Sequence, residues 1–272
     1  MEVLTELGTR VAVHDLGGDG EPLLICHATG FCGRAYEPLA TALAERHHVF
    51  AVDLRGHGDS PPPPDLDFGW QSMTADVRAA ARAIGPGPIH AIGHSLGGAV
   101  ALQTQATYAD VFATAYLYEP IVVEPGRFLP NRNPMADSAR SRTEVFTSKE
   151  AALWHYANRT QLGGLSAASL AAYVDHGFET LPDGRIRLKC RAEWEARTFE
   201  ATGGITTQTV AGVSIPVVVA VGDEPSSPLV ALGPGIIDAL ENARLLVYDR
   251  FGHFGPLQPP RRIVADVFAL TG

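Results

Sequence analysis

The chain has 272 residues, a length that suits one large folded domain or one domain carrying an insertion. Hydrophobic residues make up 46% of the sequence, which is enough to build a buried core and excludes wholesale disorder. The 21 basic residues against 30 acidic ones give a net charge of -9, which argues against nucleic-acid binding because such a surface needs a positive patch.

The three cysteines, Cys26, Cys32 and Cys190, are odd in number and form no C-x-x-C pair, so reduced thiols are expected rather than a disulfide framework. Residues 1–10 contain acidic side chains and no apolar core of signal-peptide length. No stretch reaches the roughly 18–20 apolar residues that a membrane-spanning helix needs. We therefore expect a cytoplasmic protein that does not contact a membrane.

Short apolar runs alternate with helical patterns through the first half of the chain. The pattern predicts strands at 11–13, 23–26, 49–52, 89–92 and 112–117. Helical spacing predicts helices at 36–44, 73–84 and 96–108. Uninterrupted apolar strands between helices are typical of a parallel sheet with both faces covered.

The alternation stops between about residues 124 and 209, where charged, alanine-rich stretches predict a mostly helical insertion. It then resumes with strands at 217–221 and 245–247 and helices at 229–240 and 259–270. The sequence thus indicates an α/β fold interrupted once.

The motif with the clearest chemistry is Gly93-His-Ser-Leu-Gly97, which fits G-x-S-x-G and lies between a predicted strand and a predicted helix. Ser95 would occupy a sharp, strained turn, and side chains at positions 93 and 97 would collide with neighbouring backbone. The turn would expose the hydroxyl at a helix amino end, where free N–H groups favour developing negative charge. Ser95 is therefore the candidate nucleophile.

A serine hydroxyl needs a base to take its proton, and His253 is the candidate. This histidine follows the last predicted strand in a glycine-rich loop, so it would lie at the same carboxyl edge of the sheet as Ser95. His27, His57 and His94 are interpreted as residues with other roles, and His27 is expected to pin its loop by hydrogen bonds.

Stabilising a tetrahedral oxyanion requires two preorganised donors. One is expected to be the backbone N–H of Leu96, which follows the nucleophile. The other should come from the loop after the strand at 23–26, where Gly30 allows close approach. The N–H of Phe31 is the favoured second donor, with Thr29 as the alternative.

Four segments together resemble the α/β-hydrolase superfamily over essentially the whole length, namely 27–33, 53–60, 93–98 and 252–254. The resemblance implies a mostly parallel eight-stranded sheet flanked by helices, with a helical lid inserted after the sixth strand. The core would then comprise residues 1–123 and 210–272, and the lid residues 124–209. It also implies hydrolysis of an ester, thioester, amide or related bond without a cofactor.

The acid of the catalytic triad is left open between two regions. Most relatives have an aspartate three residues after a glycine at the end of the seventh strand, but Pro225 stands there in this chain. Asp223 or Glu224 could replace it. Some relatives instead place the acid after the sixth strand, where Glu119 follows an apolar run, and Glu119 is preferred.

We expect a serine esterase that acts through an acyl-enzyme on a small, apolar molecule. A C–C bond hydrolase, a lyase or cyclase of a secondary pathway, and a receptor-like ligand-binding protein remain alternatives. No metal site is expected, because the histidines and acids lack ligand spacing. The oligomeric state is left open. Aromatic residues of the insertion could line a pocket or pack its core, namely Phe128, Phe146, Trp154, Tyr156, Tyr173, Phe178 and Trp194.

Overall fold

The computed structural model describes residues 1–126, 133–158, 162, 164–224 and 228–272. Phe128 and Pro225, both considered above, lie outside these ranges. Within the described chain, no helix is long and apolar enough to cross a membrane.

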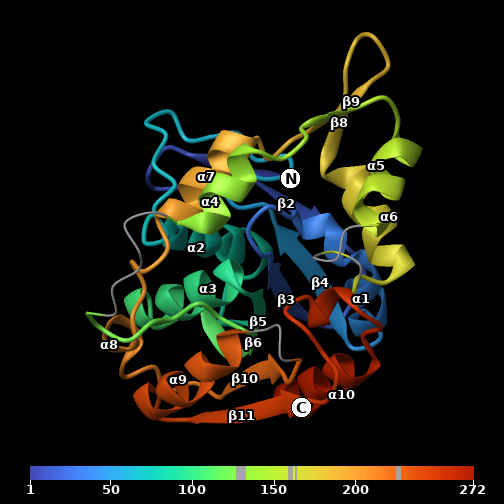
Figure 1. Cartoon of the computed structure of the whole chain (residues 1–272). Helices are drawn as coiled ribbons and strands as arrows, with labels where there is room; N and C mark the ends of the chain where they lie inside the picture. The colour runs from blue at the N-terminus through green and yellow to red at the C-terminus, as the bar shows by residue number, and fades with distance from the viewer. Residues whose placement is uncertain (127–132, 159–161, 163, 225–227) are drawn as a thin grey trace.

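A mostly parallel sheet of eight strands runs through the molecule, with helices on both sides (Figure 1). Within this sheet, as far as the structure describes the chain, the antiparallel pairs are β1 with β2 and β2 with β4. The spatial order is β1 (Glu2–Leu4), β2 (Arg10–Asp15), β4 (His47–Val52), β3 (Glu21–Cys26), β5 (Ile89–His94), β6 (Phe112–Tyr118), β10 (Val217–Gly222) and β11 (Ala243–Tyr248).

Helices cover each face because the central strands are apolar on both sides. Along β10, Val217 and Val219 pack into one buried cluster while Val218 and Ala220 pack into the other. The first cluster includes α2 (Met73–Ile84), α3 (Leu96–Thr107), α8 (Thr207–Val210) and α9 (Gly233–Ala239). The second includes α1 (Glu37–Leu43), which follows a 3-10 turn over Gly33–Tyr36, and α10 (Arg261–Thr271).

Apart from the helix predicted at 229–240, the elements predicted from the sequence for the sheet and its flanking helices are confirmed, and α2 has the predicted bounds of 73 and 84. The predicted helix at 229–240 divides into a 3-10 turn over Pro228–Leu232 and α9, because Pro234 enters the pattern at the start of α9. β1 was not predicted, since it has only three residues at the edge of the sheet.

The segment between β6 and β10 contains the helices α4 (Pro134–Arg140), α5 (Lys149–Ala157), α6 (Ala167–His176) and α7 (Ala192–Glu200) before α8. The prediction of a mostly helical segment omitted a small antiparallel sheet with the order β7 (Val145–Phe146), β9 (Ile186–Leu188) and β8 (Phe178–Thr180). We refer to residues 124–209 as the insertion.

Aromatic residues of the insertion mainly pack against one another. Tyr156 and Tyr173 have ring centroids 5.5 Å apart, and both rings contact Phe178. Phe146 joins the same buried cluster, whereas Trp154 is 72% exposed. Core packing is therefore the role of most of the buried aromatic residues.

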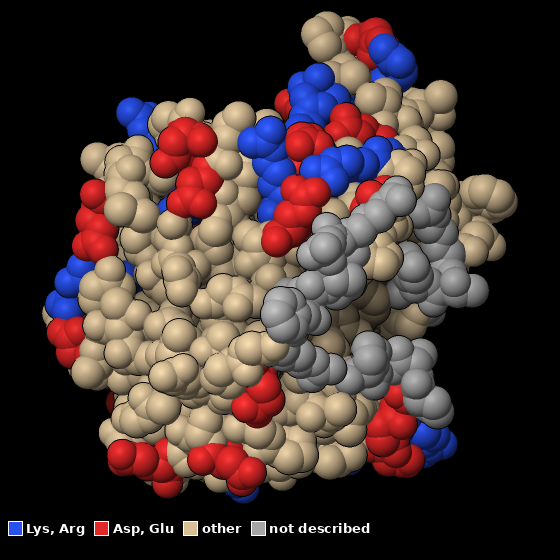
Figure 2. Space-filling model, turned by 60° about the vertical axis from the view of Figure 1, so that its left-hand side comes forward, with Lys and Arg blue, Asp and Glu red and all other residues tan. Residues whose placement is uncertain are grey.

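Charged side chains join the two helices of the insertion that lie next to each other in Figure 1, α4 and α7. Arg140 contacts Glu193 at 2.8 Å and Glu200 at 2.6 Å. Figure 2 shows basic and acidic side chains interspersed on the upper part of this face of the molecule. These exposed pairs each contribute little stability, and the helices also share a small buried cluster of Ala136, Ala139 and Ala196.

Candidate active site

Ser95 lies at the turn between β5 and α3 with φ 54° and ψ -114°, a conformation that few non-glycine residues adopt. The flanking glycines are sterically required. A Cβ atom on Gly93 would lie 2.5 Å from the Gly98 Cα, and one on Gly97 would lie 2.2 Å from the carbonyl oxygen of Cys26. The predicted strand, strained turn and helix are therefore all present.

The turn is fastened to the neighbouring strand. The Ser95 amide donates to the carbonyl oxygen of Tyr118 at 2.9 Å, and Tyr118 is the last residue of β6. Leu96 begins α3, so its N–H belongs to the first turn of a helix, where amides have no partner within the helix. This is the position at which an oxyanion donor was predicted.

Glu119 directly follows β6 and adopts the left-handed backbone region with φ 44°. Its side chain is completely buried, and Oε2 lies 2.6 Å from Nδ1 of His253. Its other oxygen, Oε1, accepts the backbone N–H of Gly222 at 3.0 Å. These two contacts offset the cost of burying a carboxylate.

The contact with Glu119 fixes the tautomer of His253. A carboxylate can only accept, so Nδ1 must carry the hydrogen, and in the neutral ring Nε2 then has the lone pair that a general base needs. The side chain of His253 is 26% exposed, so the ring is not sealed in the core.

The other two acid candidates make different contacts. Asp223 accepts the backbone N–H of Arg250 at 2.6 Å, and so it supports the loop before His253. Glu224 donates its backbone N–H to Phe251 at 3.1 Å, and its carboxylate lies against Gly252. Of the three acids, Glu119 is the one whose carboxylate meets Nδ1 of His253.

The loop after β3 forms a tight turn in which the N–H of Phe31 donates to the carbonyl oxygen of Ala28 at 3.1 Å. Gly30 has φ +78°, as the third position of a type II turn requires. The amide of Phe31 is thus engaged, whereas the Thr29 amide has no acceptor among the described residues. Phe31 stays a prediction, and the turn favours the alternative, Thr29.

A model of the alpha/beta hydrolase family matches residues 23–267. The chain belongs to this family. Among solved structures, the fold of this hydrolase is similar to E-2-(acetamidomethylene)succinate hydrolase, with a TM-score of 0.80, 20% identity, and coverage of 100% of this chain and 98% of that chain. It is also similar to a thioesterase domain from the curacin biosynthetic pathway, with a TM-score of 0.81, 17% identity and 99% coverage of both chains.

Two curated relatives match part of the hydrolase. Protein phosphatase methylesterase 1 of Mus musculus is 29% identical over 177 residues, which are 63% of this chain and 45% of the relative. N-formylmaleamate deformylase of Pseudomonas putida is 33% identical over 129 residues, which are 47% of this chain and 48% of the relative. The matched region is about half the length of these curated relatives.

Two further histidines of the hydrolase support loops. His27 is fully buried, and its Nε2 accepts the N–H of Leu54 at 3.0 Å while Nδ1 donates to Ala28 at 2.8 Å. Burial lowers the pKa of His27 to about 4, so the ring is neutral at pH 7. The predicted pinning role of His27 is confirmed. His57 is also buried, and its Nδ1 bonds to the carbonyl oxygen of Arg55 at 3.0 Å.

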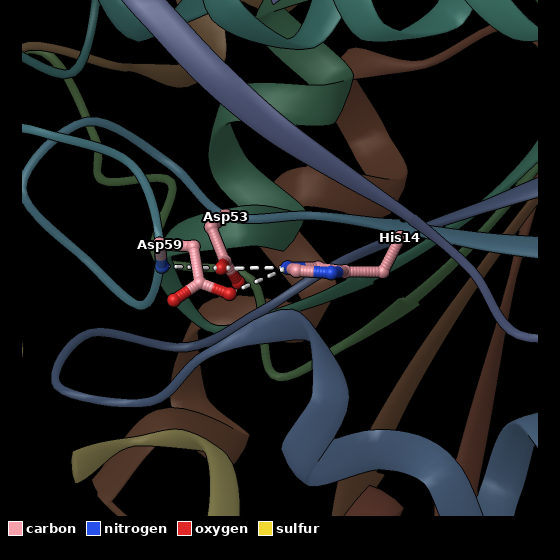
Figure 3. Close-up of side chains that lie close together, drawn as sticks. All are labelled: His14, Asp53 and Asp59. Carbon is pink, nitrogen blue, oxygen red and sulfur yellow. Dashed lines mark hydrogen bonds and ion pairs between the residues drawn. The ribbon is translucent and has the colours of Figure 1, made fainter. Parts of the chain in front are cut away.

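Figure 3 shows a cluster of polar side chains formed by His14, Asp53 and Asp59. Their ligand atoms all lie within 4.8 Å of one another, a separation that could hold a metal ion. However, the Asp53 oxygens accept the N–H of Gly33 at 2.6 Å and that of Asp59 at 2.7 Å, and His14 Nε2 lies 2.8 Å away. These contacts fit a hydrogen-bonding centre that fastens β2 to the loop after β4.

The pKa of Asp53 agrees with that interpretation. Burial alone would raise the pKa of this carboxyl, but the hydrogen bond and charge of His14, together with His27 and the Asp59 amide, leave it below its usual value. Asp53 is thus held as an anion by donors already in place.

The sequence patterns missed an ion pair of the insertion that lies over the turn at residues 28–31, where the second oxyanion donor is predicted. Arg142 is paired with Glu195, and its guanidinium also donates to the hydroxyls of Tyr156 at 3.0 Å and Tyr173 at 2.9 Å. A Cβ atom on Gly30 would lie 2.4 Å from Glu195 Oε1. No local motif signals this contact, because the two charged residues are distant in the sequence.

Proposed function

We propose that this hydrolase cleaves an ester, thioester or similar acyl bond of a small, apolar molecule through an acyl-enzyme on Ser95. The observation that carries the proposal is the 2.6 Å contact between the buried carboxylate of Glu119 and Nδ1 of His253. Glu119 follows Tyr118, whose carbonyl oxygen holds the Ser95 amide, so one strand end serves both the nucleophile and the base.

In the proposed reaction the Ser95 oxygen attacks the carbonyl carbon while its proton passes to Nε2 of His253. The oxyanion receives hydrogen bonds from the Leu96 N–H and from an amide of the turn at residues 28–31. His253 returns the proton to the leaving alcohol or thiol. It then takes a proton from water as the water oxygen attacks the acyl carbon, and it passes that proton to the Ser95 oxygen when the bond between Ser95 and the acyl group breaks and the acid is released. Glu119 holds the ring and stabilises its charged form without taking the proton.

We further propose that the insertion acts as a lid over this site, with residues 1–123 and 210–272 as the core. The ring of Tyr173 lies 5.0 Å from the ring of Phe31, and Phe31 lies 5.5 Å from Phe254, the neighbour of His253. Because these rings connect the insertion to both loops of the site, the insertion is suited to supply the apolar wall of a substrate pocket.

The direct test is turnover of p-nitrophenyl acetate and covalent labelling by a fluorophosphonate. The wild type should show both, and Ser95→Ala should abolish labelling and reduce kcat by at least about 10³-fold. Ser141→Ala, at an exposed serine of the insertion, is the matched control and should retain both. A folded wild type that is never labelled would contradict the nucleophile assignment.

Cleavage of a C–N bond is the second candidate, and two names among the comparisons favour it. The deformylase from Pseudomonas putida and the acetamidomethylene succinate hydrolase are named for amide-like substrates, whereas the mouse relative is named a methylesterase. The same nucleophile and base could attack either bond. Comparing kcat/KM for matched N-formyl amides and methyl esters would decide between them. Saturable binding without turnover would instead support the receptor-like alternative. Cleavage of a C–C bond would support the C–C bond hydrolase, and elimination or ring closure would support the lyase or cyclase.

A further inference from the structure

The loop that carries His253 has no regular secondary structure and is held by side chains of two neighbouring strands. Tyr118 donates its hydroxyl to the carbonyl oxygen of Gly252 at 2.7 Å. His94 Nε2 lies 2.7 Å from the carbonyl oxygen of His253 itself. Because His94 immediately precedes Ser95, this second bond joins the backbone of the nucleophile turn to the backbone of the base.

The other nitrogen of the His94 ring also makes a hydrogen bond, which extends the connection to a third loop. Nδ1 of His94 lies 2.6 Å from the hydroxyl of Tyr36, and that hydroxyl lies 3.1 Å from the backbone nitrogen of Ala28 in the oxyanion loop. The side chains of His94 and Tyr36 are fully buried. One chain of three hydrogen bonds therefore links the turn before Ser95, the loop of His253 and the turn at residues 28–31.

Hydrogen-bonding capacity fixes the direction of every bond in the chain. The His253 carbonyl can only accept, so His94 must carry its hydrogen on Nε2. Burial, followed by the charge of His253, lowers the pKa of His94 well below its usual value, so the ring is neutral and Nδ1 must accept from Tyr36. The Tyr36 oxygen in turn accepts the N–H of Ala28. No other arrangement of protons satisfies these groups.

We propose that His94 and Tyr36 are positioning residues whose hydrogen-bond chain holds the backbone of His253 in register with Ser95, so that the imidazole can exchange a proton with the serine. This inference rests on the proposed function. Glu119 fixes the rotation and tautomer of the His253 ring, but the chain through His94 fixes where its backbone lies. A shift of about 1 Å in such a group can reduce turnover about 10²-fold.

Two substitutions separate the two bonds of His94. In His94→Gln the side-chain amide nitrogen reaches the place of Nε2 and keeps a donor for the His253 carbonyl. In His94→Asn the amide oxygen takes the place of Nδ1, which keeps the acceptor for Tyr36 but loses the donor. We expect kcat to fall about 10²-fold in His94→Asn with KM nearly unchanged, and to stay within about tenfold in His94→Gln.

His90→Asn is the matched control. His90 lies on the same strand, is also buried, and bonds to Thr114 and Glu21 rather than to the site. This variant should lower Tm without lowering kcat per labelled serine. Activity is counted per fluorophosphonate-reactive Ser95, so that misfolded protein does not contribute.

Nitrogen-15 NMR of histidine-labelled protein supplies a readout that needs no turnover. His94 should show the neutral Nε2–H tautomer, and the Nδ1–H signal of His253 should change in His94→Asn but not in His90→Asn. A wild type without turnover that keeps these signals would overturn the proposed function and leave the positioning geometry supported. The positioning role is overturned if His94→Asn retains wild-type kcat, if kcat of the Gln and Asn variants merely follows Tm, or if His94 has the other tautomer.

Discussion

Replacing Glu119 by glutamine is the most informative change at this site, because it preserves the shape of the side chain, removes its charge and replaces one accepting oxygen by a donating NH₂ group. Among the described residues, the carboxylate accepts from the Gly222 N–H at 3.0 Å and from His253 Nδ1 at 2.6 Å. A glutamine can accept only on its oxygen. The Gly222 amide is fixed in the backbone at the end of β10 and will hold that oxygen, so the NH₂ group faces His253.

The expected size of the effect follows from the tautomer. Nδ1 must then accept from the NH₂ group, so the hydrogen of the ring moves to Nε2 and no lone pair remains there for the proton of Ser95. If the ring hydrogen returned to Nδ1, the His253 Nδ1–H and the glutamine NH₂ would face each other as two donors. The side chain at position 119 is fully buried, so water could not relieve this conflict. We expect kcat to fall roughly 10³–10⁴-fold, as for the loss of the acid in other serine triads.

The assay measures kcat on p-nitrophenyl acetate together with the rate of fluorophosphonate labelling and Tm. Glu224→Gln is the matched control, because it makes the same chemical change in the loop that follows β10, and it should keep kcat within about threefold. If Glu119→Gln retains more than a tenth of wild-type kcat, or if Glu224→Gln loses as much, the assignment of Glu119 as the orienting acid is refuted.

Three further predictions concern the surroundings of the site. Gly30→Ala would force a Cβ to within 2.4 Å of the Glu195 carboxylate and should destabilise the fold by about 1–3 kcal/mol in urea unfolding, whereas Gly184→Ala, at a similar φ with open space around it, should cost less. His27 has a pKa lowered to about 4 from 6.5, so its contribution is complete above pH 6.5 and is lost as pH falls towards 4. The wild type should therefore lose about 2 kcal/mol more than His27→Gln between pH 7 and pH 5, and equal losses would contradict this. Arg142→Gln leaves the buried Glu195 carboxylate without its cation and should lower the unfolding free energy by about 3–5 kcal/mol, and a double variant with Glu195→Gln that loses the sum of both effects would argue against their pairing.

The strands and helices around the sheet could be predicted because their sequence pattern has a single physical cause. Strands buried on both faces are continuously apolar, and helices with one buried face repeat every three to four residues. The helix at 73–84 shows this, since Met73, Val77 and Ala80 are buried at helical spacing. Where burial does not organise the sequence, as in the edge strand β1, the pattern carries no signal.

The small sheet of the insertion could not be predicted for a related reason. β9 has three residues, Ile186–Leu188, with a charged residue between two apolar ones, and β7 has two residues. Such segments are too short for a period of two to stand out from chance. Their pairing depends on contacts across about 40 residues of chain, such as Phe146 opposite Ile186.

The site shows the same division between local and distant information. Ser95 and its two glycines are specified by five consecutive residues, because the turn is a local object with local steric demands. Arg142 and Glu195 meet over Gly30 from separate parts of the insertion, and Tyr36 meets His94 across 58 positions. Neither pair leaves a trace in any one segment.

The proposed acid, Glu119, was only partly predictable from local sequence, and the register of the sheet explains why. Tyr118 lies opposite Ala220 in the parallel pair of β6 and β10, so Glu119 leaves β6 at the carboxyl edge close to the end of β10, where its Oε1 accepts the Gly222 N–H. A carboxylate from either strand end could in principle reach His253, since the chemistry requires only an acceptor at Nδ1. In this chain β6 supplies the carboxylate and β10 supplies the backbone N–H that orients it. The end of β6 and the end of β10 thus both contribute to orienting His253. The residues after β10 alone therefore could not identify the proposed acid.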